Sequence, residues 1–434
     1  MNTSNHPLRQ TLLDELHLRP FSDFDGAGRF IRFVYLSDGQ DSDIITPVTD
    51  WLENNHRAPI GQAEKFRREQ FDDFALRVER HSEFVTISFI VKGFEVTSGL
   101  HETAFDEAAQ TALPFSLVKA IPTPLFHAIW VEVGGQAPSD LTPETVTEML
   151  ACRASASSLI SEGAAQLHCG FDVDQNGYSR AMLFNQSIPP NRMGRVVQRL
   201  VELETYRMLA LLGLPLVRSV SSELSMIETE LQSLTSEVNL QITSGIEDVG
   251  RLLPSLSRLA AQAENLSAET SFRLSATTAY CEIFTSRMDR LNISRLDGYQ
   301  GLYGFLDRRM MPAMQTCNAF SARLDSLSER IGRTGSLLRT QTEFKIQKQN
   351  TSLLASMDRR AQAQLRLQQT VEGLSVIAGT YYGVGLVEVV AKYIAPTAVS
   401  TDLVKAASLP FVAFLIWLIL RRGSQMVHKL DTKK

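Results

Sequence analysis

The pattern of apolar and polar positions divides the chain into three parts, and the first predicts strands. From about Arg29 to Phe184, short β-branched and aromatic runs are separated by polar turns, which is typical of strands. Helices are expected over Pro47–Phe71, around ETAFDEAAQTAL and over Pro143–Ser161. Together these elements predict an α+β (α/β-type) domain with a mainly antiparallel sheet over residues 1–190, on the cytoplasmic side. The predicted strands are RFIRFVYL, FALRVERHSEFVTISFIV, LFHAIWVEV, AAQLHCGF and YSRAMLFN.

The second part, residues 191–370, predicts a stalk of long helices. It is almost free of proline, and its apolar residues recur at helical spacing. One run keeps a strict alternation of three and four, the mark of a coiled coil, and then continues at intervals of four, a stutter. Breaks are expected at Pro254 and within DGYQGLYGFLDRRMMP, and the last helix is expected to begin near Phe320 and to enter the third part without interruption. The alternating run is Leu224, Ile227, Leu231, Leu234 and Val238, and the stutter adds Ile242 and Ile246.

The third part, residues 371–434, predicts a transmembrane helical hairpin with a basic cytoplasmic tail. The apolar runs Val371–Ile394 and Leu403–Leu420 are each long enough to cross a hydrocarbon core of about 30 Å at about 1.5 Å per residue. Basic residues precede the first run and follow the second, whereas the short connection has no such cluster. Since basic residues favour the cytoplasmic side, we expect a multi-pass protein of the inner membrane with both termini in the cytoplasm. The basic residues are Arg359, Arg360, Arg366, Arg421, Arg422, Lys429, Lys433 and Lys434.

Composition narrows the function classes. The 434 residues are 44% hydrophobic and 21% charged, with a net charge of −5, and no basic face is evident, so nucleic acid is not an expected partner. The four cysteines show no metal-ligand spacing, which argues against a zinc site or a disulfide framework. The first residues, MNTSNHPLRQ, contain no apolar stretch typical of a signal peptide.

The first apolar run carries polar residues that suggest a pore. On a helix that turns by about 100° per residue, Tyr381, Gly385 and Glu388 fall along one stripe. If this stripe faced a symmetry axis, it would present a ring of tyrosines and a ring of carboxylates, which attract cations. These three residues are therefore the candidate pore-lining residues.

The same run also supports a simpler interpretation. Gly379 and Gly383 form a GxxxG pair, which lets two helix backbones approach closely. Glu388 and Lys392 are four residues apart and can pair with each other near the membrane surface. The sequence leaves both interpretations open, with helix packing favoured.

A weak candidate for a metal site lies in DVDQNGY. Asp172, Asp174 and Asn176, followed by Gly177, match the first half of a calcium-binding loop, but Leu183 stands where the loop needs a bidentate glutamate. Asn-Gly between two strands is also a strong hairpin signal, and the hairpin is favoured. No cofactor is evident, and a divalent cation is the one ligand that this pattern leaves open.

The remaining polar groups indicate no enzyme. His17, beside Glu15 and Arg19, suggests either a proton-linked switch or a docked N-terminal segment, and the second is favoured. The chain lacks a P-loop, a GxSxG elbow, a GxGxxG fingerprint and an HExxH pair. We therefore expect no catalytic residues.

Several longer stretches carry a resemblance to a known family. HPLRQTLLDELHLRPF, GRVVQRLVELETYRMLALLGLP, LLASMDRRAQAQLRLQQTVEGLSVIAGTYYGVGL and the final apolar runs resemble a family of uncharacterised bacterial membrane proteins, over nearly the whole chain. More distantly, the predicted architecture resembles the CorA-type divalent-cation channels. The Gly-Met-Asn signature of those channels is absent, and Gly383, Val384 and Gly385 stand nearest to it.

Two function classes follow. The CorA-like build implies a homo-oligomeric cation conduit with a cytoplasmic sensing domain. The GxxxG pair and the missing signature favour a membrane-anchored scaffold or sensor without transport activity. In both, the expected partners are the lipid bilayer and further copies of the chain.

Overall fold

The computed structural model describes residues 26–37, 39–62, 64–92, 104–105, 113–244, 249–394 and 401–431, together with His6 and Arg9. The chain forms two units. The first comprises Met1–Ser236 with Pro254–Arg333, and the second comprises Glu237–Leu253 with Thr334–Lys434. The predicted ELHLRPF segment and most of ETAFDEAAQTAL lie outside the described residues.

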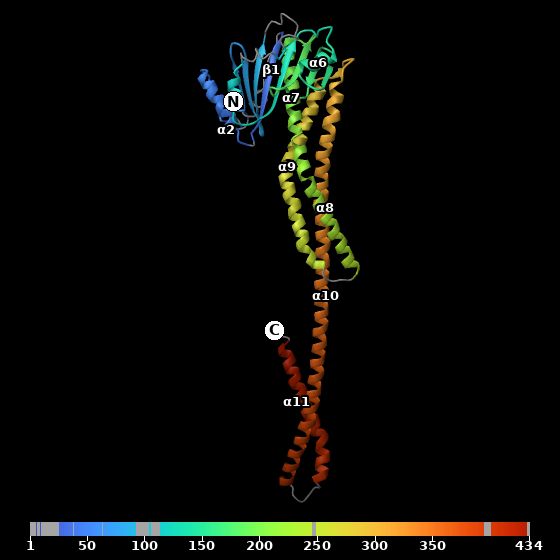
Figure 1. Ribbon diagram of the computed structural model, residues 1–434. Helices are drawn as coiled ribbons and strands as arrows, with labels where there is room; N and C mark the ends of the chain where they lie inside the picture. The colour runs from blue at the N-terminus through green and yellow to red at the C-terminus, as the bar shows by residue number, and fades with distance from the viewer. Residues whose placement is uncertain are drawn as a thin grey trace, which may run out of the picture. The chain divides into compact units, whose positions relative to one another are not determined.

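The first unit is built on a large mixed sheet (Figure 1). Its strand order is β2-β3-β4-β1-β5-β8-β7-β6-β9. Neighbouring strands are antiparallel except β5 and β8, which pair in parallel. The strands are β1 (Gly28–Leu36), β2 (Phe66–Gln70), β3 (Ala75–Arg80), β4 (Phe84–Lys92), β5 (Leu125–Gly134), β6 (Ser155–Ile160), β7 (Ala165–Gly170), β8 (Ser179–Asn185) and β9 (Ser294–Arg295).

Helices cover both faces of this sheet, because its central strands are apolar on both sides. Short helices α2 (Ser42–Asn54), α5 (Phe115–Ala120) and α6 (Pro143–Met149) pack on one face, against residues such as Phe33 and Trp130. Long helices pack on the other face, against residues such as Phe30 and Val131. The long helices of that face are α7 (Pro190–Ala210), α9 (Leu253–Arg290) and the beginning of α10 (Leu302–Ile394).

Two strands, β2 and β6, lie in segments that the sequence predicted as helices. The segment expected as a helix over Pro47–Phe71 is the end of α2 followed by β2, and the segment expected over Pro143–Ser161 is α6 followed by β6. β2 reads FRREQ and β6 reads SASSLI, so neither shows the apolar alternation of a half-buried strand. They form because neighbouring strands offer backbone hydrogen bonds, which a one-dimensional pattern does not reveal.

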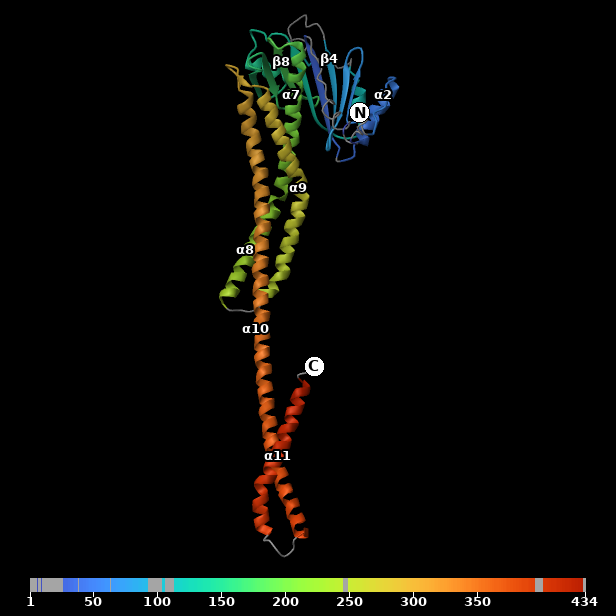
Figure 2. The ribbon, with the colours of Figure 1, turned by 180° about the vertical axis from the view of Figure 1, so that it is seen from behind.

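Of the two breaks predicted after residue 190, the one at Pro254 is confirmed, because α9 begins at Leu253. Helix α8 (Gly213–Thr243) precedes a 3-10 turn (Val249–Leu252) and α9, and Figure 2 shows α7, α8 and α9 from behind. The break predicted over DGYQGLYGFLDRRMMP occurs only in the first residues of this stretch. Helix α10 begins within it at Leu302 and continues through Pro312. The last helix therefore begins well before Phe320.

The predicted coiled-coil positions of α8 are buried. Leu224, Ile227, Leu231, Leu234 and Val238 are each at most 8% exposed. The next buried residue is Gln241, three positions on, rather than Ile242. The alternation of three and four thus continues through a polar residue, and the stutter predicted at this point does not occur; Ile246 lies outside the described residues.

The predicted fold class was wrong at both ends of the chain. The N-terminal sheet, expected to be mainly antiparallel, is a nine-stranded mixed sheet with one parallel pair, β5 and β8, and takes its ninth strand from residues 294–295. The transmembrane hairpin is not shown: among the described residues, only α10 contains an 18-residue window apolar enough to cross a membrane. In α11 (Thr401–Asp431), the apolar stretch found among the described residues is the shorter Lys405–Ile419.

Candidate functional site at the C-terminal helices

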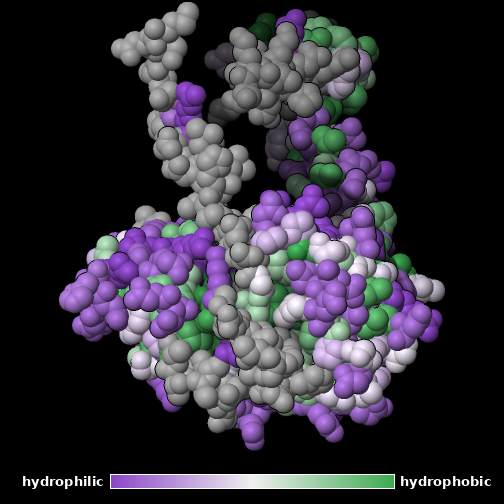
Figure 3. Space-filling view, turned by 90° about the horizontal axis from the view of Figure 1, so that it is seen from above, coloured by the Kyte–Doolittle hydropathy of each residue, from purple (hydrophilic) through white to green (hydrophobic). Residues whose placement is uncertain are grey.

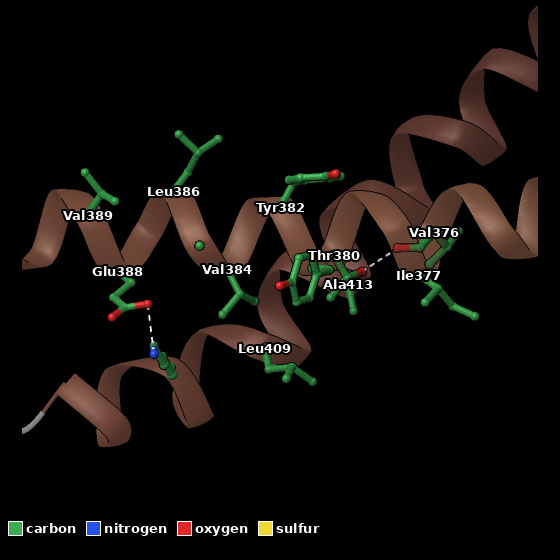
Figure 4. A pocket seen from close by; sticks show the side chains of 13 residues that line it. Val376, Ile377, Thr380, Tyr382, Val384, Leu386, Glu388, Val389, Leu409 and Ala413 are labelled. Atoms are coloured by element: carbon green, nitrogen blue, oxygen red, sulfur yellow. Dashed lines mark hydrogen bonds and ion pairs between the residues drawn. The ribbon is translucent and has the colours of Figure 1, made fainter.

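The end of α10 and the first part of α11 form a groove of about 840 Å³ within the second unit. Figure 4 shows Thr380, Val384 and Glu388 on the side of α10 that faces α11, and Tyr382 and Leu386 on the side that points away. The groove wall is mainly apolar. Its lining from α11 is Lys405, Leu409 and Ala413.

The structure brings the three candidate pore-lining residues together along this groove. Tyr381, Gly385 and Glu388 all line it. The Tyr381 side chain is 78% exposed, and no atom lies within 4 Å of the place where a Cβ of Gly385 would stand. The stripe of α10 that carries these three residues is therefore not covered by other described residues at Tyr381 and Gly385.

The carboxylate of Glu388 is held by two ammonium groups. Lys392, one turn further along α10, places its Nζ 2.9 Å from Oε1, and Lys405 of α11 places its Nζ 2.9 Å from Oε2. Two positive charges thus face one negative charge. The sequence suggested the pair with Lys392 but missed Lys405, because that contact depends on how α11 returns along α10.

Gly379 and Gly383 lie on the side of α10 that packs against α11. A Cβ on Gly383 would stand 2.5 Å from Cγ1 of Val412, and a Cβ on Gly379 would stand 3.2 Å from Cδ1 of Ile416. Because real Cβ atoms do not approach a neighbour to 2.5 Å, any larger residue at position 383 would push the helices apart. The glycine pair and the pore-lining candidates therefore occupy different faces of the same helix.

The residues of DVDQNGY form the turn between β7 and β8. Asp172 accepts two hydrogen bonds from Arg153, one from the side-chain Nη2 at 2.6 Å and one from the backbone N–H of Arg153 at 2.7 Å. Asp174 pairs with Arg180 at 2.6 Å and accepts the backbone N–H of Asn176 at 2.9 Å. Both carboxylates already have guanidinium partners. Among the described residues, no group of three or more His, Cys, Asp and Glu could hold a metal ion.

Sequence reasoning missed a buried carboxyl group on the sheet, Glu132 of β5. Its Oε1 accepts three hydrogen bonds, from Nε of Arg29 at 2.7 Å, from Nε1 of Trp130 at 2.9 Å and from the backbone N–H of Phe105 at 3.2 Å. Its Oε2 has no hydrogen-bond partner among the described residues. Burial raises the pKa of Glu132 to about 7, although Arg29 opposes this shift.

A second buried carboxyl group, Glu79 of β3, lies between two arginines. Arg32 donates from Nη2 at 3.1 Å and Arg77 from Nη2 at 2.9 Å, and both guanidinium groups are almost fully buried. Burial alone would raise the pKa of Glu79, but the two arginines outweigh it and lower the pKa to about 2. Charged residues within otherwise apolar strand sequences, as in RFIRFVYL, FALRVER and IWVEV, were the sequence signal for these buried ion pairs.

The comparison with protein-family models decides where the chain belongs. The family described as "Protein of unknown function (DUF3422)" matches residues 4–427. The chain is a member of the DUF3422 family. No curated protein and no solved structure matches it. The DUF3422 match takes in the sheet, the long helices and the groove, so it covers both units of the structure.

Proposed function

We propose that this DUF3422 protein is a membrane-anchored scaffold or sensor. In this proposal, the apolar end of α10 enters the bilayer, and the sheet unit lies in the cytoplasm, where it binds its partners or signals. The observation that carries the proposal is the neutralised carboxylate of Glu388, because it leaves the groove without a site that attracts cations.

The exposed side chains of the α10 window support the anchor. None of the window is buried within the protein. Leu374, Ile377, Leu386 and Val389 are each at least 66% exposed. Exposing apolar surface to water costs about 25 cal/mol of free energy per Å². The hydrocarbon of a bilayer would cover these side chains and remove that cost. By contrast, Figure 3 shows mainly hydrophilic residues on the visible face of the rounded body of the first unit.

The charges that precede the window support the orientation. Arg359, Arg360 and Arg366 lie in the last turns of α10 before the apolar window. Basic residues next to a span remain on the cytoplasmic side. The first unit, which precedes these arginines in the chain, is therefore assigned to the cytoplasm.

The charge of the groove argues against a cation conduit. A ring of carboxylates attracts cations into a pore only if its charge is free to act on the ion. Here each Glu388 is paired with Lys392 and Lys405 at 2.9 Å, so a ring of such groups would carry a net positive charge. Helix packing at Gly379 and Gly383 accounts for the same helix without a conduit.

A flux assay tests the proposal. The purified protein is reconstituted into liposomes that contain a magnesium-sensitive dye, and external Mg²⁺ is then added. The proposal predicts an influx equal to that of protein-free liposomes. Rapid influx that is lost in Glu388→Gln but kept in the matched variant Glu372→Gln would overturn it.

One observation favours the alternative, a homo-oligomeric cation conduit. Tyr381, Gly385 and Glu388 line one groove, and the stripe is open at the first two. Cysteines placed singly at Tyr381 and Gly385 distinguish the two functions. A conduit predicts rapid reaction of both with a membrane-impermeant thiol reagent. The anchored module predicts that lipid protects them at least as well as a cysteine placed at Leu386.

A further inference from the structure

The interior seam of α10 continues beyond the point where other helices cover it. Leu324, Leu327, Ile331 and Leu338 are buried on this seam, with at most 7% of each exposed. Thr342, the next position, still lies 3.8 Å from the place of a Cβ on Gly250. After Thr342, the side chains of α10 are almost all exposed up to residue 371.

The exposed segment keeps the spacing of a coiled coil. Ile346, Asn350, Leu353 and Met357 follow at intervals of four, three and four. The same alternation passes through two polar residues, Arg360 and Gln364, before it reaches Leu367 and Val371. Ile346, Leu353, Met357 and Leu367 are between 51% and 66% exposed. A helix with a narrow apolar seam at this spacing is stabilised by packing against another helix. We call residues 346–371 the open seam.

The charges around the open seam suit a second copy of the same chain. In the heptad that places Leu353 at d and Met357 at a, the flanking e and g positions from 347 to 370 carry no charged residue. Two identical helices in register can therefore meet along the seam without repulsion at its flanks. The charged side chains of this segment lie at the outward b, c and f positions, with one exception. They are Lys348, Asp358, Arg359 and Arg366, and the exception is Arg360, at d.

We infer that the open seam binds the open seam of a second copy, as a parallel two-stranded coiled coil. The parallel direction rests on the proposed anchor, because two α10 helices that enter the same membrane run the same way. Asn350, at a, then faces its counterpart, and a buried asparagine at a favours two strands in register. Gln364, also at a, faces its counterpart and can pair with it through its side-chain amide. Arg360, at d, also faces its counterpart and weakens the pair by repulsion.

Cross-linking between single introduced cysteines tests this pairing. Leu353→Cys places a thiol at d, and the matched control Ala355→Cys places one at f, two residues away on the outer face. The full-length protein in native membranes is treated with a short bismaleimide, and the wild-type protein sets the background from its own cysteines. We expect at least about tenfold more cross-linked dimer for Leu353→Cys than for Ala355→Cys. Equal yields, or none above background, would overturn the inference.

The mass of the purified protein in mild detergent gives an independent readout. The wild type is expected to be a dimer. Leu353→Glu with Met357→Glu should yield a monomer, whereas Ala355→Glu should leave the dimer intact. Arg360→Leu should strengthen the dimer about tenfold, since it replaces a repulsive pair with an apolar one. A wild-type monomer, or a mass unaffected by the double substitution, would contradict the pairing.

Membrane retention separates this inference from the proposed function. The Leu353→Glu, Met357→Glu protein should remain in the membrane fraction, because its apolar window is intact. A monomer that stays in the membrane leaves the anchor standing and confirms that the seam makes the dimer. Loss of the wild-type protein from the membrane would instead refute the anchor.

Discussion

Glu132 and Glu79 show how two buried carboxyl groups beside arginines acquire opposite pKa shifts. Glu132 has one guanidinium partner, Arg29, and one carboxyl oxygen without a hydrogen bond among the described residues, so burial dominates and raises its pKa to about 7. Glu79 has two guanidinium partners, which lower its pKa to about 2. The number of charged neighbours, rather than burial alone, decides the direction.

For Glu132, we predict that the wild type loses stability as the pH rises. A carboxyl group whose pKa is higher in the folded state than in the unfolded state binds more protons when folded, so its contribution is present at pH 4.5 and is lost by about pH 7. The loss is about 3 kcal/mol, from roughly 1.4 kcal/mol per pKa unit. In Glu132→Gln this loss should be absent. Urea unfolding monitored by tryptophan fluorescence checks it, with the exposed Glu53→Gln as the control.

For Glu79, the sign is reversed. Its folded pKa lies below the ordinary value, so its stabilisation is present above about pH 4.5 and is lost as the pH falls toward 2. Glu79→Gln leaves the buried Arg32 and Arg77 without a carboxylate and should cost about 3 kcal/mol at pH 7. An unfolding free energy within about 0.5 kcal/mol of the wild type at pH 7 would contradict this account.

At the scale of elements, the two glycines Gly383 and Gly385 provide a matched pair. Gly383→Ala places a methyl group against Val412, whereas Gly385→Ala places one in open space. Overpacking costs about 1–3 kcal/mol, so the first substitution should separate α10 from α11 and the second should not. A cysteine at Ile416, which leaves Val412 in place, should then react about tenfold faster with a thiol reagent in the Gly383→Ala background only. Equal reactivity in both backgrounds would show that the contact does not hold the helices.

The elements also show what could be predicted from the sequence. Strands with clear apolar alternation, such as RFIRFVYL, and the buried positions of α8 were found from their periods. β2 and β6 were missed because their side chains carry no such pattern, although each forms a hairpin with the next strand, β3 and β7 respectively. The pair of Glu388 with Lys405 was missed because it joins two helices. The hairpin was predicted from two apolar runs, but among the residues that the structure describes only α10 has a window of sufficient length.

At the scale of the whole molecule, the central claim is that the apolar window of α10 holds the protein in a membrane. The claim depends on the exposed apolar side chains of that window rather than on apolar exposure in general. Leu353 is equally exposed but lies outside the window, so it provides a control. Leu386→Arg with Val389→Arg should release the protein from the membrane, whereas Leu353→Arg should not, since each charge in hydrocarbon costs about 2.5–3.5 kcal/mol.

The most direct test is to wash membranes from cells that express the protein with alkaline carbonate and to follow the protein in the pellet and the supernatant. The account predicts that the wild type stays in the pellet with the lipid, as does Leu353→Arg. Recovery of the wild-type protein in the supernatant would contradict the anchor and, with it, the proposed function.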